Sequence, residues 1–290
     1  QNGRGNKKYS YASSALTIKE DMQKFRDLVL AFRQLDLDGS RPVIAHASLS
    51  SFGYVNGGAE AVVGALDHHF DQVIMPTFTY KTMIVPSSGP LNNASKYGSL
   101  VDLNKMTEFF HADMPADKLM GAVPELLRKQ AKATRSFHPI LSFAGINAKE
   151  ILDQQTLKHP LAPIAKLADL DAWVLLLGVG QKANTSIHLG ERLAGRKTFM
   201  RWALVPDLIV ECPGFPSCSD GFDAIEDHIQ PIVRKKHVGK ALIKAIPLRG
   251  LIKITRKLVE EDPLALLCEN FYCERCKAVR AEVAYKLLND

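Results

Sequence analysis

The chain has 290 residues, of which 46% are hydrophobic, so it can bury a sizeable core like other globular proteins. Its net charge of +6 favours anionic partners such as a nucleotide-bearing cofactor, nucleic acid or an acidic membrane surface, and it says nothing about the fold. No apolar stretch approaches the ~18 residues of a membrane span, and the polar start lacks the apolar segment of a signal peptide. We therefore expect a cytoplasmic protein with no membrane partner, unless a leader was removed. Residues 1–16 are expected to form a polar tail, and residues 17–290 a single domain.

The first expected element is a helix from about Thr17 to Leu35. The letters TIKE form a capping box, in which Thr17 is the N-cap and Glu20 follows three residues later. Apolar residues then recur at helical spacing and form one face of this helix: Met22, Phe25, Leu28, Val29, Phe32 and Leu35. Such a face predicts packing against a core.

Strands and helices alternate along the rest of the chain. The predicted strands lie in residues 41–49, 71–80, 140–144, 172–177 and 199–212. The predicted helices lie in residues 57–70, 119–129, near 148 and 163, and in 223–229, 251–261 and 278–288. This order predicts an α/β fold with a mostly apolar central sheet covered by helices on both faces, a three-layer αβα arrangement. Residues 81–118 are rich in Pro, Asn, Ser and Gly and form an expected loop-rich insertion that binds a ligand.

The stretch HASLSSFGYVNGG leads from a buried strand into a helix. Its hydroxyl groups and backbone N–H groups, together with Gly57 and Gly58 at the helix start, suit an anion or an amide-bearing chain. It matches neither a Walker A loop nor the dinucleotide G-x-G-x-x-G pattern. The residues alone are compatible with a ligand loop and with an ordinary strand-to-helix turn.

A second candidate is RSFHPILSF, in which Arg135 can meet a phosphate or carboxylate. His138 precedes a proline and is expected to be extended. From composition, the favoured interpretation is a surface arginine and a packed histidine at the entrance of a strand.

The stretch NTSIHLGE follows the buried strand of residues 172–177. Asn184, Thr185 or Ser186 can cap a helix that begins here, which places His188 and Glu191 on one face at i and i+3. A histidine beside a carboxylate is a possible general base. The competing interpretation is a surface pair worth a few tenths of a kcal/mol.

All five cysteines lie in the last third of the chain. Their odd number argues against a disulfide framework. Four thiolates from two loops can hold a structural Zn²⁺, but the spacing is not a paired C-x-x-C…C-x-x-C, so buried, unligated thiols are favoured over zinc. The candidate ligands are Cys212, Cys218, Cys268, Cys273 and Cys276.

A basic stretch without acidic residues runs from Arg234 to Lys257. It is expected to be a solvated helix face, and the competing interpretation is a patch that meets cofactor phosphates or nucleic acid. Few aromatic residues lie between the charges, which disfavours binding of single-stranded nucleic acid.

Taken in order, six blocks resemble the aminoglycoside 3-N-acetyltransferase family. They are HASLSSFGYVNGGAEAVVGAL, MPTFTY, MGAVPELLRK, RSFHPILSFAG, VLLLGVG with NTSIHLGE, and CSDGF, and they span roughly residues 41–222. The resemblance implies transfer of an acetyl group from acetyl-coenzyme A to the 3-amino group of an aminoglycoside antibiotic, by direct attack in a ternary complex.

The resemblance also implies a role for particular positions. His188 would be the general base, Glu191 would orient it, and Thr185 would hydrogen-bond the thioester oxygen. Tyr80 and Asp113, with Glu191, would contact the acceptor. The coenzyme would be held by Ser48, Leu49, Ser50, Ser51, Val55, Asn56, Gly57, Gly58, Arg135 and Ser136.

The acceptor is where the chain departs from this pattern. Aminoglycosides are polycations and need acidic residues, whereas residues 81–118 hold only Asp102, Glu108, Asp113 and Asp117. Acetylation of a different amine therefore remains open, as does a protein of another class that binds anions or nucleic acid through the basic stretch.

Overall fold

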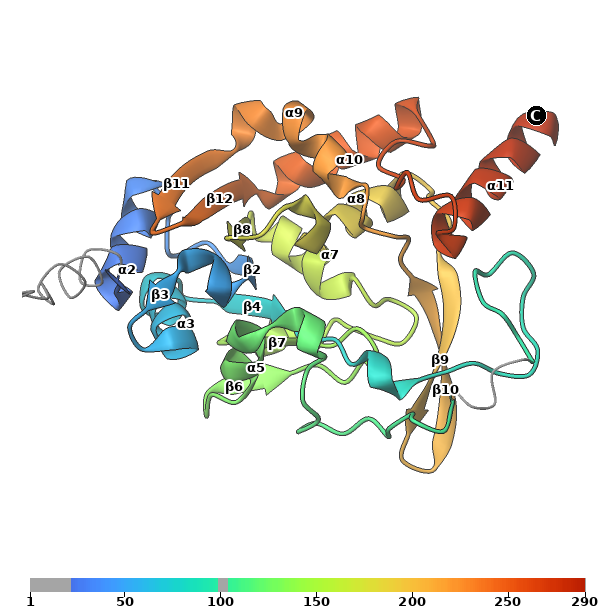
Figure 1. The fold of residues 1–290 in the computed structure, drawn as a ribbon, viewed down its shortest axis with the longest axis horizontal. Helices are drawn as coiled ribbons and strands as arrows, with labels where there is room; N and C mark the ends of the chain where they lie inside the picture. The colour runs from blue at the N-terminus through green and yellow to red at the C-terminus, as the bar shows by residue number, and fades with distance from the viewer. Residues whose placement is uncertain (1–21, 99–103, 290) are drawn as a thin grey trace, which may run out of the picture.

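The computed structural model describes residues 22–98 and 104–289. Its centre is a seven-stranded sheet with the strand order β11-β12-β8-β2-β4-β7-β6 (Figure 1). Only the pairs β8–β2 and β2–β4 are parallel, and the outer pairs are antiparallel. The strands are β2 (Val43–Ala47), β4 (Val73–Pro76), β6 (Ala133–Arg135), β7 (Phe143–Ile146), β8 (Trp173–Leu177), β11 (Arg234–Val238) and β12 (Ala241–Pro247).

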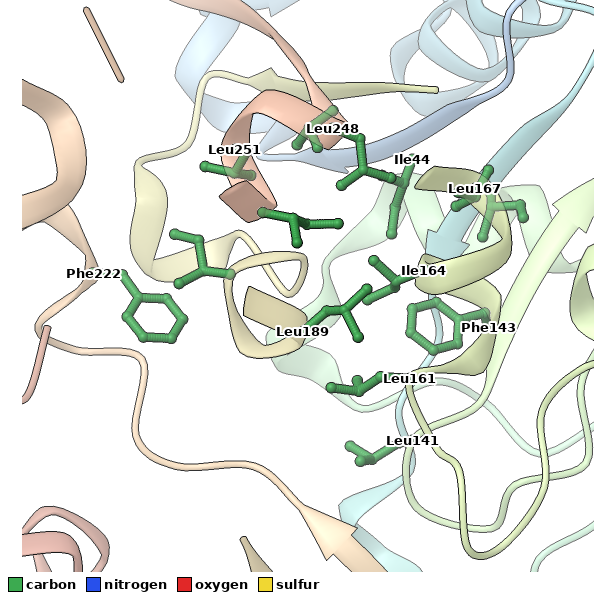
Figure 2. Packing of buried hydrophobic residues seen from close by; sticks show 14 of the residues in the cluster. Ile44, Leu141, Phe143, Leu161, Ile164, Leu167, Leu189, Phe222, Leu248 and Leu251 are labelled. Carbon is green, nitrogen blue, oxygen red and sulfur yellow. The ribbon is translucent and has the colours of Figure 1, made fainter. Parts of the chain in front are cut away.

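Helices cover both faces of this sheet. One core contains Val43 and Ala45 of β2 and the inward residues of α2 (Phe25–Gln34), α3 (Gly58–His69) and α5 (Ala122–Arg128). Ile44, between those two strand residues, belongs to the opposite core, as the alternation of side chains along a strand requires. The helices on that side are α6 (Lys149–Leu152), α7 (Ala162–Asp169), α8 (Ile187–Leu193), α9 (Glu226–Ile229), α10 (Leu248–Glu261) and α11 (Glu274–Asn289). The three-layer αβα prediction is confirmed, and Figure 2 shows residues of α7, α8 and α10 packed around Ile44.

A second, three-stranded sheet stands apart from the central one. It consists of β5 (Met83–Ile84) and the hairpin of β9 (Phe199–Val205) and β10 (Leu208–Phe215), all antiparallel. The described parts of the loop-rich region, residues 81–98 and 104–118, contact this hairpin: Met83 pairs with Ala203, and Phe110 N–H donates to the Leu204 carbonyl at 3.0 Å. The hairpin is visible at the lower right of Figure 1.

The first helix differs from its prediction. The proposed cap at Thr17 and Glu20 lies outside the described residues. Met22 belongs to β1 (Met22–Gln23), which pairs with β3 (Tyr54–Val55), so the helix begins only at Phe25. The Lys24 N–H is satisfied by Asp27, whose carboxylate accepts it at 2.8 Å. Phe25 is 40% exposed, whereas the other predicted apolar residues from Leu28 onward are buried.

The basic stretch is also arranged differently from the prediction. Its first part forms strands β11 and β12 and only its last part is helical, in α10. Several of its charges are paired within the protein: Lys244 with Glu226, Arg256 with Glu260 and Lys257 with Glu261. This stretch is therefore no continuous basic helix face. None of the helices in the described part of the chain is both long and apolar enough to cross a membrane.

Candidate active site

The candidate site lies where the chain order of the sheet reverses. From β2 the chain continues to β4 on one side, while β8 lies on the other, and all three strands are parallel. The carboxyl ends of parallel strands at such a switch point are the usual ligand site of open α/β sheets. His46 and Ala47 at the end of β2, together with residues just beyond β4 and β8 such as Phe78 and Val179, line a cavity of about 320 Å³.

His188 enters this cavity from the first turn of α8. Its Nδ1 lies 2.8 Å from Glu191 Oε2, and the two side chains are 10% and 2% exposed. A carboxylate only accepts, so Nδ1 carries the proton and Nε2 is the basic nitrogen. The edge of the ring contacts Phe222, with 4.7 Å between ring centroids. The predicted His–Glu pair is thus a buried, oriented pair and not a surface pair.

Two further residues hold Glu191. Ser217 Oγ donates to Glu191 Oε2 at 2.8 Å, and Arg196 Nε lies 3.5 Å from Glu191 Oε1. Arg196 is itself buried, which lowers its pKa, and its Nη2 donates to the Ala265 carbonyl. Ser217, 26 positions away along the chain, gave no signal in the sequence, because only the return of β10 toward α8 brings it here.

The segment before α8 is fixed by side-chain hydrogen bonds. Ser186 occupies the N-cap position, but its hydroxyl has no partner. The Asn184 side chain forms the hydrogen bonds at this helix start: its Oδ1 accepts the Ser186 N–H at 3.2 Å, and its Nδ2 donates to Gln181. Thr185 lines the cavity beside His188. This arrangement fixes the position of the Thr185 and His188 backbone.

A second hollow, of about 620 Å³, lies over the Ser- and Gly-rich turn. Five of the predicted coenzyme residues line it: Ser48, Leu49, Ser50, Val55 and Gly58. Ser51, Asn56 and Gly57 belong to the same turn without lining the hollow. The two hollows share the lining residues Ala47, Leu119, Met120 and Val179. They therefore adjoin, and the turn and His188 lie on one continuous stretch of surface.

Gly57 and Gly58 carry the chain into α3 with left-handed backbone angles, φ 82° and 53°. Residues with a Cβ rarely adopt this conformation. The first N–H groups of this 12-residue helix have no acceptor within the helix, and its first residue, Gly58, lines the hollow.

Arg135 and Ser136 are not brought to either hollow. The Arg135 guanidinium donates to the Ser142 hydroxyl and to the carbonyls of Thr77, Ala112 and Met114. Burial lowers its pKa to about 10. Ser136 is hydrogen-bonded to the backbone of Phe143. Arg135 thus connects β6 to the neighbouring loops, and Ser136 connects the residue after β6 to β7. His138 is the packed histidine that composition favoured, since its Nδ1 accepts from the Ile140 and Leu141 amides.

Of the predicted acceptor residues Tyr80 and Asp113, one lines the cavity and the other does not. Tyr80 lines the cavity, and burial raises its pKa to about 12. Asp113 is exposed in the loop that Arg135 fastens and does not line the cavity. Three lining residues with ionisable side chains were not predicted: His46, Lys182 and Arg275. His46 had a usable signal, because strand alternation puts it on the same face of β2 as Ile44, toward α8.

The comparison with known proteins identifies the family. A family model described as aminoglycoside 3-N-acetyltransferase matches residues 44–260. The chain belongs to the aminoglycoside 3-N-acetyltransferase family. The sequence resemblance of the six blocks is thereby confirmed, and the match covers every element that builds the cavity except α11.

Two relatives and one solved structure show how far the similarity to this family extends. The aminoglycoside N(3')-acetyltransferase-like protein YokD of Bacillus subtilis is 33% identical over 186 residues, 59% of this chain and 66% of the relative. Aminoglycoside N(3)-acetyltransferase IX of Micromonospora chalcea is 34% identical over 55% of this chain and 58% of the relative. The chain thus aligns with less than two thirds of each relative. The apoenzyme structure of AAC(3)-IVa shares the fold, with a TM-score of 0.72, 24% identity and coverage of 90% and 97% of the two chains.

Proposed function

We propose that the protein is an acetyl-coenzyme A-dependent N-acetyltransferase that acetylates the 3-amino group of an aminoglycoside, with His188 as general base. The observation that carries this proposal is the His188–Glu191–Ser217 chain of hydrogen bonds, which lies in a cavity that adjoins the Ser48–Gly58 turn. A protein that binds anions through a basic surface needs no such pair inside a cavity. This placement therefore favours the enzyme over the binding protein.

The chemistry requires a base, because an ammonium group has no lone pair with which to attack a thioester. The ammonium first loses one proton to solvent; His188 Nε2 takes a second proton from the nitrogen as the N–C bond forms, and the C–S bond then breaks. The imidazolium returns its proton to the departing thiolate of coenzyme A. Glu191 stabilises the imidazolium through Nδ1 and keeps the ring in the productive tautomer. The Thr185 hydroxyl, from a residue that lines the same cavity, would donate to the oxygen that gains charge in the tetrahedral intermediate.

The route is direct transfer between the two bound substrates. The described residues that line the cavity include serines and threonine but no cysteine. Among the described lining residues, none has a thiol that could form an acetyl-enzyme. Ser217 does not take this role, because its hydroxyl proton is already donated to Glu191.

The hollow over the turn is the proposed coenzyme site. Its described lining carries hydroxyl groups and glycines without charged side chains, so backbone N–H groups and the start of α3 would hold the pantetheine and phosphates. AAC-IIIb, another protein of this fold, was determined as a binary complex with CoASH. We also propose a cytoplasmic location, supported by five cysteines that are free of disulfides.

A second candidate function is supported by the charges of the cavity. The described lining contains Lys182 and Arg275 but no carboxylate, and Glu191 lies behind His188. A polycation gains little from such a wall, whereas an amine with fewer positive charges, or with an acidic group, fits it. The second candidate is therefore acetylation of such an amine by the same His188 mechanism.

The test is a thiol-release assay with acetyl-coenzyme A and two sets of amines, aminoglycosides and small amines that are neutral or acidic. We expect the His188→Ala variant to lose about 10²- to 10⁴-fold in kcat with the accepted substrate, the range of general-base catalysis. It should still bind coenzyme A in calorimetry, because His188 does not line the coenzyme hollow.

The control is His228→Ala, a change of an exposed histidine on α9, which should keep full activity. Turnover by the His188 variant at the wild-type rate would refute the general-base role. Turnover of the second set of amines but not of aminoglycosides would establish the second candidate function.

A further inference from the structure

Four of the five cysteines form one cluster beside the active site. The Sγ atoms of Cys218, Cys268, Cys273 and Cys276 all lie within 4.8 Å of one another. Three of these cysteines are buried and Cys273 is half-buried. They come from two segments that are far apart in sequence: Cys218 from the loop after β10, and the other three from the loop that leads into α11 and the first turn of that helix. The fold therefore builds a compact group of four thiols that the spacing alone did not predict.

The size of the cluster suits a tetrahedral metal ion. Four sulfurs at the Zn–S distance of about 2.3 Å lie about 3.8 Å apart along the edges of a tetrahedron. The Cys268 and Cys276 sulfurs are 3.4 Å apart, much farther than the ~2.05 Å of a disulfide. Cys273-x-x-Cys276 is the ligand spacing of many structural zinc sites. A disulfide would involve only two of these cysteines, whereas a tetrahedral metal site involves all four thiolates.

Cys212 provides an internal comparison. It is buried in β10 as a single thiol, and the cluster does not include it. Burial among apolar residues raises its pKa to about 12, as expected for an inert, packed cysteine. The chain thus contains one ordinary buried thiol and, separately, a group of four.

The surroundings of the cluster can stabilise thiolates. The Asp220 backbone N–H donates to Cys218 Sγ at 3.4 Å. Arg280 donates to the Cys268 carbonyl at 2.7 Å, and the buried Arg196 lies within electrostatic range of Cys276. Four thiolates on a divalent ion carry a net charge of −2, which Arg280 and Arg196 offset in part, since Arg196 also faces Glu191.

We propose that Cys218, Cys268, Cys273 and Cys276 bind one Zn²⁺ ion in a closed, four-thiolate structural site. Binding replaces the thiol protons with four Zn–S bonds and releases those protons to solvent. With four protein ligands, the ion has no open position for substrate, so the site is structural and not catalytic.

The location gives the ion a positioning role. Cys218 lies between Ser217, which donates to Glu191, and Ser219, which lines the cavity. Cys276 adjoins Arg275, which also lines the cavity and donates to the Ser217 carbonyl at 2.9 Å. The ion would therefore join the start of α11 to the wall of the active site and hold Ser217 in place. The metal site itself does not depend on which reaction the cavity performs.

The first experiment is metal analysis of the full chain, purified without an affinity tag or chelator. We expect about one zinc per chain in the wild type and in the Cys212→Ser control, and a loss of zinc in Cys276→Ser. A thiol-specific mercurial should release the zinc in proportion to the cysteines that it modifies. Absence of zinc from the wild type, with no uptake by chelator-treated protein, would overturn the proposal. Iron at the same stoichiometry would overturn the choice of metal.

The second experiment guards against a variant that does not fold. Wild-type protein is stripped of metal and titrated with Co²⁺, which gives intense visible bands in a tetrahedral site and sulfur-to-metal charge-transfer bands in the near ultraviolet. We expect saturation at one equivalent and displacement by Zn²⁺. Weak bands typical of octahedral cobalt would contradict a four-thiolate site.

Discussion

His46 and His138 differ from His188 in what their surroundings allow. Both are buried as neutral rings: burial lowers the pKa of His46 to about 3 and that of His138 to about 4. Neither has a partner for Nε2. His188, by contrast, has the buried carboxylate of Glu191 on Nδ1. Of these three histidines, only His188 has a carboxylate partner on Nδ1, which is the partner that the proposed base requires.

The neutral buried histidines predict a loss of stability in acid. The unfolded chain takes up a proton on each of these two histidines near its ordinary pKa of 6.5, whereas the folded protein takes it up only near pH 3 to 4. The unfolded state thus binds more protons between these values, so the free energy of unfolding falls as the pH falls through 6.5. Each histidine should contribute about 2 kcal/mol between pH 7.5 and pH 5.

Urea unfolding at pH 7.5 and pH 5 checks this expectation. In His46→Gln, the difference between the two pH values should shrink by about 2 kcal/mol, because glutamine does not titrate. The exposed His228→Ala should leave the difference unchanged. An equal pH dependence in wild type and His46→Gln would show that His46 is not held neutral in the folded state.

Helix α8 carries His188, the proposed base, and the position of the helix depends on close packing against α10. A Cβ atom at Gly190 would lie 2.5 Å from the Thr255 Cβ, too close for any real contact. We expect Gly190→Ala to destabilise the protein by about 1–3 kcal/mol, the usual cost of overpacking, and to lower kcat because α8 is displaced. Thermal unfolding and the acetyl-transfer assay measure both effects.

Gly64 in α3 is the matched control at the level of the helix. A Cβ there would meet only the Phe25 ring at 3.5 Å, an ordinary contact. Gly64→Ala should therefore be neutral or stabilise the helix by up to about 1 kcal/mol. If the two variants have equal melting temperatures, tight packing between α8 and α10 does not determine the position of His188.

At the scale of the whole molecule, the sequence predicted layers and local pairs better than long-range contacts. Periodicity predicted both faces of the sheet, and i,i+3 spacing predicted the pair of His188 and Glu191. The contact of Ser217 with Glu191 could not be predicted, and the five cysteines named as candidate ligands could not be narrowed to the four that meet, because only the folded chain brings these segments together. Arg135 is a residue whose type misled the prediction. An arginine suits a phosphate, but this guanidinium donates its hydrogen bonds to nearby backbone carbonyls.

The net charge of +6 is of the sign that would attract the proposed anionic coenzyme. The described lining of the coenzyme hollow is uncharged, but Lys240, in the β11–β12 turn, borders it: its amide donates to the Phe52 carbonyl, and a Cβ at Gly53 would lie 3.8 Å from its side chain. We expect Lys240→Glu to raise the KM for acetyl-coenzyme A about two- to fivefold at low salt, as for an exposed charge pair of roughly 0.4–1 kcal/mol.

The effect of Lys240→Glu should shrink as salt is added, because exposed charges are screened within about 8 Å at physiological ionic strength. Lys257→Glu is the matched control, since it changes the net charge equally on α10, where Lys257 is paired with Glu261. Steady-state kinetics of both variants over a range of salt concentrations separates the local effect of Lys240 from the effect of net charge. If both variants raise the KM equally, the field of the whole molecule attracts the coenzyme, and Lys240 has no special place beside the hollow.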